Sequence, residues 1–162
     1  MGAHVVQLSE RLGFGPEDRL LIVNCDDLGS SHSANVAAFR AMTYGVATSA
    51  SLMVPCPWAA EAARMFEGLP VGVHLTLTSE HAGYRWRSLT GAASLHDAGG
   101  FLPATTARAL AQQDLDAVRA ECRAQVDAAL AWGVDVTHID THMDVLHASE
   151  ALFAIYLDLA AE

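Results

Sequence analysis

Short, β-rich apolar runs alternate with segments of helical periodicity along this chain. The apolar runs predict strands over residues 20–25, 47–54, 71–78 and 134–142. Helical spacing predicts helices over residues 33–44, 58–66, 104–131 with a break near Asp114, and from 148 to the end. Strands that alternate with helices predict a parallel sheet with right-handed crossovers. Because parallel strands are covered on both faces, this class also explains a hydrophobic fraction of 52%.

The length indicates how much of a barrel the chain can form. A closed eight-stranded α/β barrel takes about 250 residues, whereas this chain has 162. We therefore expect one α/β domain over residues 1–162, a partial or distorted (β/α) TIM-like barrel that is truncated on its C-terminal side. Such a domain would expose strand edges and apolar surface unless further residues or a second copy covered them. A homodimer is therefore one expected assembly.

Charge and cysteine content narrow the class of protein. The net charge of -10 argues against a surface that follows nucleic-acid phosphates. No lysine occurs, which excludes Schiff-base chemistry by the chain itself. Three separated cysteines indicate a reducing compartment rather than a disulfide framework. With no long apolar run in residues 1–15 and none near the roughly 20 residues that span a bilayer, we expect a cytoplasmic protein without membrane or nucleic-acid partners.

Residues that can bind metals lie at the ends of the expected strands. In α/β folds reactive groups gather at the C-terminal ends of parallel strands. The candidates come from the first, third and fourth strands: Asp26, Asp27, His74, His138, Asp140 and His142. The last three alternate along one strand and share a face, where their burial is costly unless they pair with one another or with a metal.

This set of residues suits a metal-activated water. Two imidazoles and one carboxylate can hold a divalent ion and leave positions open. Water bound there has its pKa lowered from 15.7 to about 7, and a second carboxylate can accept its proton. Each part also has an ordinary structural interpretation: Asp26-Asp27 before glycine is typical of a turn or cap, and His74 could be a hydrogen-bonded core histidine. Together, however, the residues favour a metal site.

Four motifs then occur in order: residues 24–29 (NCDDLG), 48–53 (TSASLM), 72–76 (GVHLT) and 137–142 (THIDTH). In this order they resemble the signatures of the YdjC/ChbG-like carbohydrate deacetylase family over nearly the whole chain from residue 20 onward. The resemblance implies a distorted α/β barrel that binds one divalent metal and removes acetyl groups from N-acetylated sugars or oligosaccharides. It implies Asp27, His74 and His142 as metal ligands and Asp26 as the base. Zinc or magnesium could occupy the site, and the two imidazoles favour zinc.

Other residues receive supporting roles. His138 and Asp140 share a strand face with His142, so they could orient a ligand imidazole or make ordinary core hydrogen bonds. The segment 79–102 has no periodicity, and long loops in compact domains are often functional. Within it, Tyr84 and Trp86 could stack on a sugar ring while Arg85 reaches substrate oxygens. Alternatively, these aromatic residues anchor the loop.

The leading hypothesis is therefore a metal-dependent carbohydrate N-deacetylase, a hydrolase of a linear amide C–N bond. The family's later histidine motif, which could protonate the leaving amine, is absent from this chain. The alternative is a truncated, non-catalytic metal- or sugar-binding protein, stabilised as a dimer. Metal-assisted phosphoester hydrolysis is a third, weaker hypothesis. A Ser-His-Asp hydrolase is disfavoured because no Gly-x-Ser-x-Gly motif occurs.

Overall fold

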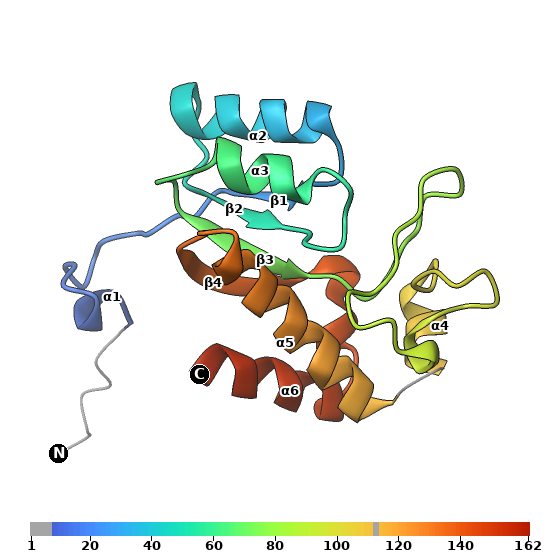
Figure 1. Ribbon diagram of the computed structural model, residues 1–162. Coiled ribbons are helices and arrows are strands. Elements are labelled where there is room, and N and C mark those ends of the chain that lie inside the picture. The colour runs from blue at the N-terminus through green and yellow to red at the C-terminus, as the bar shows by residue number, and fades with distance from the viewer. Residues whose placement is uncertain (1–7, 112–113) are drawn as a thin grey trace, which may run out of the picture.

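The computed structural model describes residues 8–111 and 114–162. Its centre is one open sheet of four parallel strands, which follow one another in chain order (Figure 1). They are β1 (Asn24–Leu28), β2 (Ser49–Leu52), β3 (Val71–Leu75) and β4 (Val136–Thr141). The predicted α/β class with parallel strands is confirmed. A closed α/β barrel has eight strands, so this sheet has half that number. As in such a barrel, each strand pairs with the next strand along the chain.

Helices precede, separate and follow the strands along the chain. They are α1 (Leu8–Arg11), α2 (His32–Tyr44), α3 (Ala59–Met65), α4 (Thr106–Ala111), α5 (Leu115–Ala131) and α6 (Glu150–Ala161), with short 3-10 helices η1 (Ala93–Leu95) and η2 (His142–His147). Side chains cap three of them, because Ser31, Asp114 and Ser149 each accept a hydrogen bond from a backbone N–H in the first turn. The predicted break near Asp114 is therefore a helix start. None of the helices within the described ranges combines the length and apolarity that crossing a bilayer requires.

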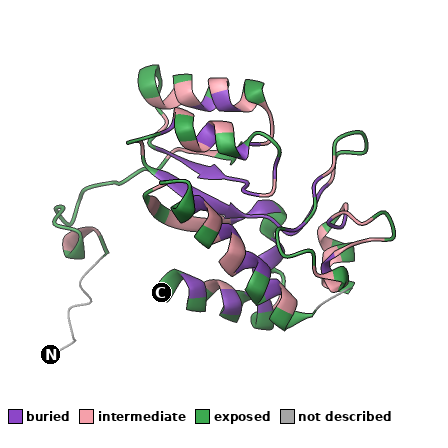
Figure 2. Ribbon diagram, viewed as in Figure 1, coloured by how far each residue is buried: buried purple, intermediate pink, exposed green. Residues whose placement is uncertain are grey.

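The two faces of the sheet differ in polarity. Alternate residues of the central strands, such as Leu52, Val73 and Leu75, are fully buried against the helices, and Figure 2 shows buried residues gathered along these strands. The opposite face carries polar side chains joined by hydrogen bonds: Asn24, Asp26, Ser49, Ser51, His74 and Asp140. We call this the polar face. It is the surface on which the candidate ligands are found.

The first strand begins later than its apolar run predicts. It starts at Asn24 rather than at residue 20. Leu21 and Ile22 are 79% and 77% exposed, and backbone contact with the segment before β2 begins only at Val23, whose carbonyl accepts from Thr48 N–H. Most of the apolar run therefore precedes the strand, and the aspartate pair lies within the strand itself. The other three strands fall inside their predicted ranges.

Candidate metal centre

A bulge in β1 brings two consecutive aspartates to one site. The pairing of β1 with β2 shifts register between Cys25 and Leu28, as an extra residue in one strand produces. Asp27 takes a left-handed backbone conformation with φ 61°, which is uncommon for a residue other than glycine. The bulge lets Asp27 turn toward His74 while Asp26 also lines the same pocket.

The turn after the aspartates is fixed by α2 and α3. Gly29 has φ 91°, and a Cβ atom there would lie 2.9 Å from the Cα of Ala59, so only glycine fits. Its N–H donates to Oδ1 of the fully buried Asn35 at 2.8 Å. The amide of Asn35 in turn donates to Glu61 at 2.9 Å. These contacts hold the end of β1, and with it Asp27, against two helices.

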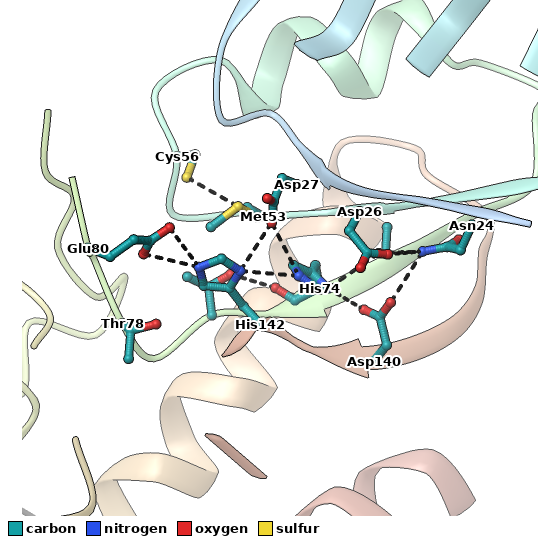
Figure 3. A network of polar contacts seen from close by, with 12 residues as sticks. Asn24, Asp26, Asp27, Met53, Cys56, His74, Thr78, Glu80, Asp140 and His142 are labelled. Carbon is teal, nitrogen blue, oxygen red and sulfur yellow. Dashed lines mark hydrogen bonds and ion pairs between the residues drawn. The ribbon is translucent and has the colours of Figure 1, made fainter. Parts of the chain in front are cut away.

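Three side chains from three strand ends converge (Figure 3). Oδ1 of Asp27 lies 3.4 Å from Nε2 of His74 and 3.1 Å from Nδ1 of His142. The two nitrogens lie 3.2 Å apart. Tetrahedral ligands with bonds of about 2.0–2.1 Å lie roughly 3.3 Å from one another, so the three atoms match one face of a zinc coordination sphere. Both imidazoles are buried, whereas the carboxylate is half exposed. We call these three residues the triad.

Backbone strain is concentrated at this site. Among the described residues other than glycine, those with positive φ are Asp27, Met143 and Asp144. All three line a pocket of about 280 Å³ beside His74 and His142. Each such conformation costs on the order of 1–3 kcal/mol and persists only where surrounding structure imposes it. Such strain often clusters at functional sites, which agrees with a candidate site at this end of the sheet.

Each imidazole of the triad is held by a carboxylate on its other side. Nδ1 of His74 lies 2.6 Å from Oδ1 of Asp140. Nε2 of His142 lies 3.2 and 3.1 Å from the two carboxylate oxygens of Glu80. Metal-binding histidines commonly donate their second ring N–H to such a partner. The placement of Asp140 agrees with the role that its strand face suggested, whereas Glu80 was missed, since its only sequence signal is an acidic residue shortly after the third strand.

The same contacts shift the protonation of the triad. Burial alone would lower the pKa of His74, but hydrogen bonds to Asp140 and Asp27 outweigh it and raise the pKa to about 9. Burial would also lower the pKa of His142, but hydrogen bonds to Asp27 and Glu80 outweigh this effect and raise it. Hydrogen bonds from both imidazoles hold the pKa of Asp27 far below its usual value. A pocket that stabilises positive charge in this way also suits a bound cation.

Asn24 holds Asp26 in place beside the triad. Its Nδ2 donates to Oδ1 of Asp26 at 2.7 Å and to Oγ of Ser51 at 2.9 Å. Ser49 donates to Oδ1 of Asn24 at 2.6 Å, which fixes the orientation of the amide. The same Nδ2 lies 3.4 Å from Oδ2 of Asp140. One amide thus joins the candidate base to the carboxylate that holds His74.

His138 is placed away from the triad. Its Nδ1 contacts the hydroxyl of Thr137 at 2.9 Å, and its ring lies against the backbone of Gly72. It lines a second pocket of about 540 Å³ on the polar face, nearer the N-terminal ends of the strands, together with Asn24 and Asp140. The structure therefore does not bring His138 into contact with either ligand imidazole.

The three loop residues differ in what they contact. Trp86 is 3% exposed, and its Nε1 donates to the carbonyl of Thr78 at 2.7 Å. Arg85 forms an ion pair with Asp97 at 2.8 Å. These contacts match the alternative in which the residues anchor the loop. Tyr84 is 38% exposed, the most of the three, and its ring meets that of Trp86 edge to face with 6.3 Å between the ring centroids.

Comparison with known proteins identifies the family of this chain. The model of the YdjC-like protein family matches residues 20–162. A carbohydrate deacetylase of Thermus thermophilus is 38% identical over 155 residues, which cover 96% of this chain and 54% of that protein. A chitooligosaccharide deacetylase of Yersinia enterocolitica is 37% identical over 134 residues, 79% of this chain and 51% of that protein.

A solved structure shows the same arrangement of elements. The crystal structure of a proposed cellobiose-phosphate cleavage protein from Enterococcus faecalis superposes with a TM-score of 0.78 and 27% sequence identity, covering 86% of this chain and 54% of that one. The chain thus spans about half the length of the curated relatives it matches. Since the family model extends from residue 20 to residue 162, through all four strands and the triad, the chain belongs to the YdjC-like family.

Proposed function

We propose that this chain carries the metal centre of a metal-dependent N-deacetylase of acetylated sugars or oligosaccharides. The observation that carries the proposal is the triad, three ligand atoms 3.1–3.4 Å apart with Asp26 lining the same pocket. The relatives support it, since they are named carbohydrate and chitooligosaccharide deacetylases. Acetylated carbohydrate is therefore the substrate class that we propose.

The chain's own residues would divide the chemistry among them. Asp27, His74 and His142 would hold one divalent ion, zinc or magnesium, and the two imidazoles favour zinc. When bound, the ion would acidify a water and polarise the amide carbonyl. Asp26 would accept the proton of the attacking water, a role worth about 10²- to 10⁴-fold in rate. Asn24 would keep the carboxylate of Asp26 directed at that water.

The loop between β3 and α4 would bind the sugar. Tyr84 has the exposed ring, which can stack on the apolar face of a sugar. Arg85 and Trp86 would act through the loop, since their polar groups bind Asp97 and the carbonyl of Thr78. Substrate contact and loop anchoring are thus divided among neighbouring residues.

Acetate release by the purified chain tests this function. The chain is loaded with Zn²⁺ or Mg²⁺ and incubated with an N-acetylated chitooligosaccharide. We expect Asp26→Asn to bind the metal and lose acetate release, and Asp27→Ala to lose both. Asp135→Asn, just before the opposite end of β4, is the matched control and should leave both unchanged. Full activity of Asp26→Asn would show that Asp26 is not the base.

A second candidate is metal or sugar binding without turnover. One observation favours it: among the described residues that line the pocket, both imidazoles are needed as ligands, which leaves neither to protonate the leaving amine. Within residues 8–111 and 114–162, no further strand pairs with the outer edge of β1 or of β4, so a second copy could pair there. Metal binding without acetate release, together with a dimeric mass in solution, would support this candidate.

A further inference from the structure

We propose that Glu80 is a positioning residue of the metal centre, which holds His142 so that Nδ1 rather than Nε2 faces the ion. The triad would then bind metal through Nε2 of His74 and Nδ1 of His142. This role rests on the metal site of the proposed function. Neither the sequence motifs nor the names of the relatives assign any role to Glu80.

The two ends of the His142 ring have different partners. Nδ1 lies 3.1 Å from Oδ1 of Asp27 and 3.2 Å from Nε2 of His74. On the far side of the ring, Nε2 lies 3.2 and 3.1 Å from the two oxygens of Glu80. Figure 3 shows the ring between these groups, with Glu80 on the side away from His74. Contacts at both nitrogens fix the rotation of the ring about the Cβ–Cγ bond.

Burial makes the Glu80 contact necessary. The side chain of His142 is 6% exposed, so an N–H at Nε2 without a partner would be costly. Glu80 accepts that proton, and its own side chain is 26% exposed. Without the carboxylate, the ring could turn and present Nε2 to the ion instead. Glu80 therefore selects the nitrogen that binds, as Asp140 does for His74 on the opposite side.

The backbone around Glu80 is fixed by the long loop. The preceding residue, Ser79, is fully buried, and its N–H donates to the carbonyl of Pro103 at 2.8 Å. The hydroxyl of Ser79 accepts from Trp86 N–H at 3.0 Å. The loop that carries the exposed Tyr84 therefore also carries the residue that orients a metal ligand. Metal affinity should then depend on the order of this loop.

Zinc titration of variants tests the role without any need for turnover. Zn²⁺ affinity is measured by competition with a chelator for the wild type, Glu80→Ala and Glu80→Gln. We expect Glu80→Ala to lower the affinity by about 10- to 100-fold. Glu80→Gln should retain most of it, because the amide oxygen can still accept the Nε2 proton. Glu67→Ala is the matched control, since it removes an exposed carboxylate from outside the pocket of the triad, and its affinity should stay within twofold of wild type.

The second readout is the identity of the bound nitrogens. Histidine-labelled protein with Zn²⁺ should show by NMR one imidazole bound through Nε2 and one through Nδ1, and Glu80→Ala should lose the Nδ1-bound form. Two Nε2-bound imidazoles in the wild type, or wild-type affinity in Glu80→Ala, would overturn the role of Glu80 and leave the metal site standing. Failure of the wild type to bind Zn²⁺ or Mg²⁺ would instead overturn the proposed function, and this role with it.

Discussion

His74 donates its Nδ1 proton to Oδ1 of Asp140 across 2.6 Å, which leaves Nε2 directed at Asp27. Replacing this acceptor should weaken metal binding, because the ring loses the contact that selects its binding nitrogen. We expect Asp140→Ala to lower Zn²⁺ affinity by about 10- to 100-fold. His138→Ala is the control, since His138 lies two residues earlier on the same strand and does not touch the triad. An equal loss in both variants would contradict a specific role for Asp140.

The stability of the metal-free protein should fall as pH rises from about 6.5 to about 9. The pKa of His74 is raised from 6.5 to about 9 in the folded chain, so its contribution to the free energy of unfolding is fully present below pH 6.5. That contribution is lost as the folded protein releases the proton. Denaturant unfolding in the presence of a chelator would measure the decline, and a flat profile over this range would contradict it.

Metal binding should show the opposite dependence on pH. The ion competes with the proton on His74, so Zn²⁺ affinity should rise by up to about tenfold per pH unit until the pKa near 9 is reached. Calorimetric titrations in buffers of different ionisation enthalpy would report the protons released. Affinity that does not change with pH would show that the imidazoles are not ligands.

Sequence reasoning predicted most of the fold because the strands of this sheet are short apolar segments between helical ones. The aspartate pair was harder to place. Leu21 and Ile22 read as strand residues, yet they are exposed, and the strand begins only where its backbone meets β2. A bulge with a left-handed Asp27 then carries both carboxylates to one pocket. Periodicity does not predict a bulge, since the extra residue depends on pairing with another strand.

Strand ends and alternation are local properties, so they predicted a group of metal-binding candidates, from which the resemblance to the family's motifs selected the three ligands. Asp27, His74 and His142 each end or follow a strand, and the structure brings their ligand atoms together. Alternation also grouped His138 with Asp140, but a register shift near the start of β4 leaves His138 over Gly72. Glu80 lies in a loop, and nothing local predicts where a loop side chain will point. Its role needed the tertiary structure.

Glu121 should be required for the position of the long loop. This fully buried carboxylate accepts from the backbone N–H groups of Leu89 and Thr90 at 3.0 and 2.9 Å, and from the hydroxyl of Thr90 at 2.8 Å. Glu121→Gln would turn an amide NH₂ toward these donors, and each group left without a partner costs about 1–3 kcal/mol. Faster hydrogen exchange at Leu89 and Thr90 with a lower melting temperature would confirm this. The exposed Glu67→Gln is the control, and equal stability of the two variants would contradict the prediction.

Gly72 should be necessary for the register between β3 and β4. A Cβ atom at this position would lie 2.5 Å from the ring of His138 and 2.6 Å from its backbone oxygen. The ring can move, but the carbonyl belongs to the irregular pairing between the two strands and cannot move freely. We therefore expect Gly72→Ala to cost about 1–3 kcal/mol, as overpacking in a core does, and to lower the melting temperature by several degrees. The double variant Gly72→Ala, His138→Ala separates the two contacts: removing the ring should recover only part of the loss, because the contact with the backbone oxygen remains. Full recovery would show that the ring alone requires glycine, and an unchanged melting temperature in Gly72→Ala would show that the strands can separate at no cost.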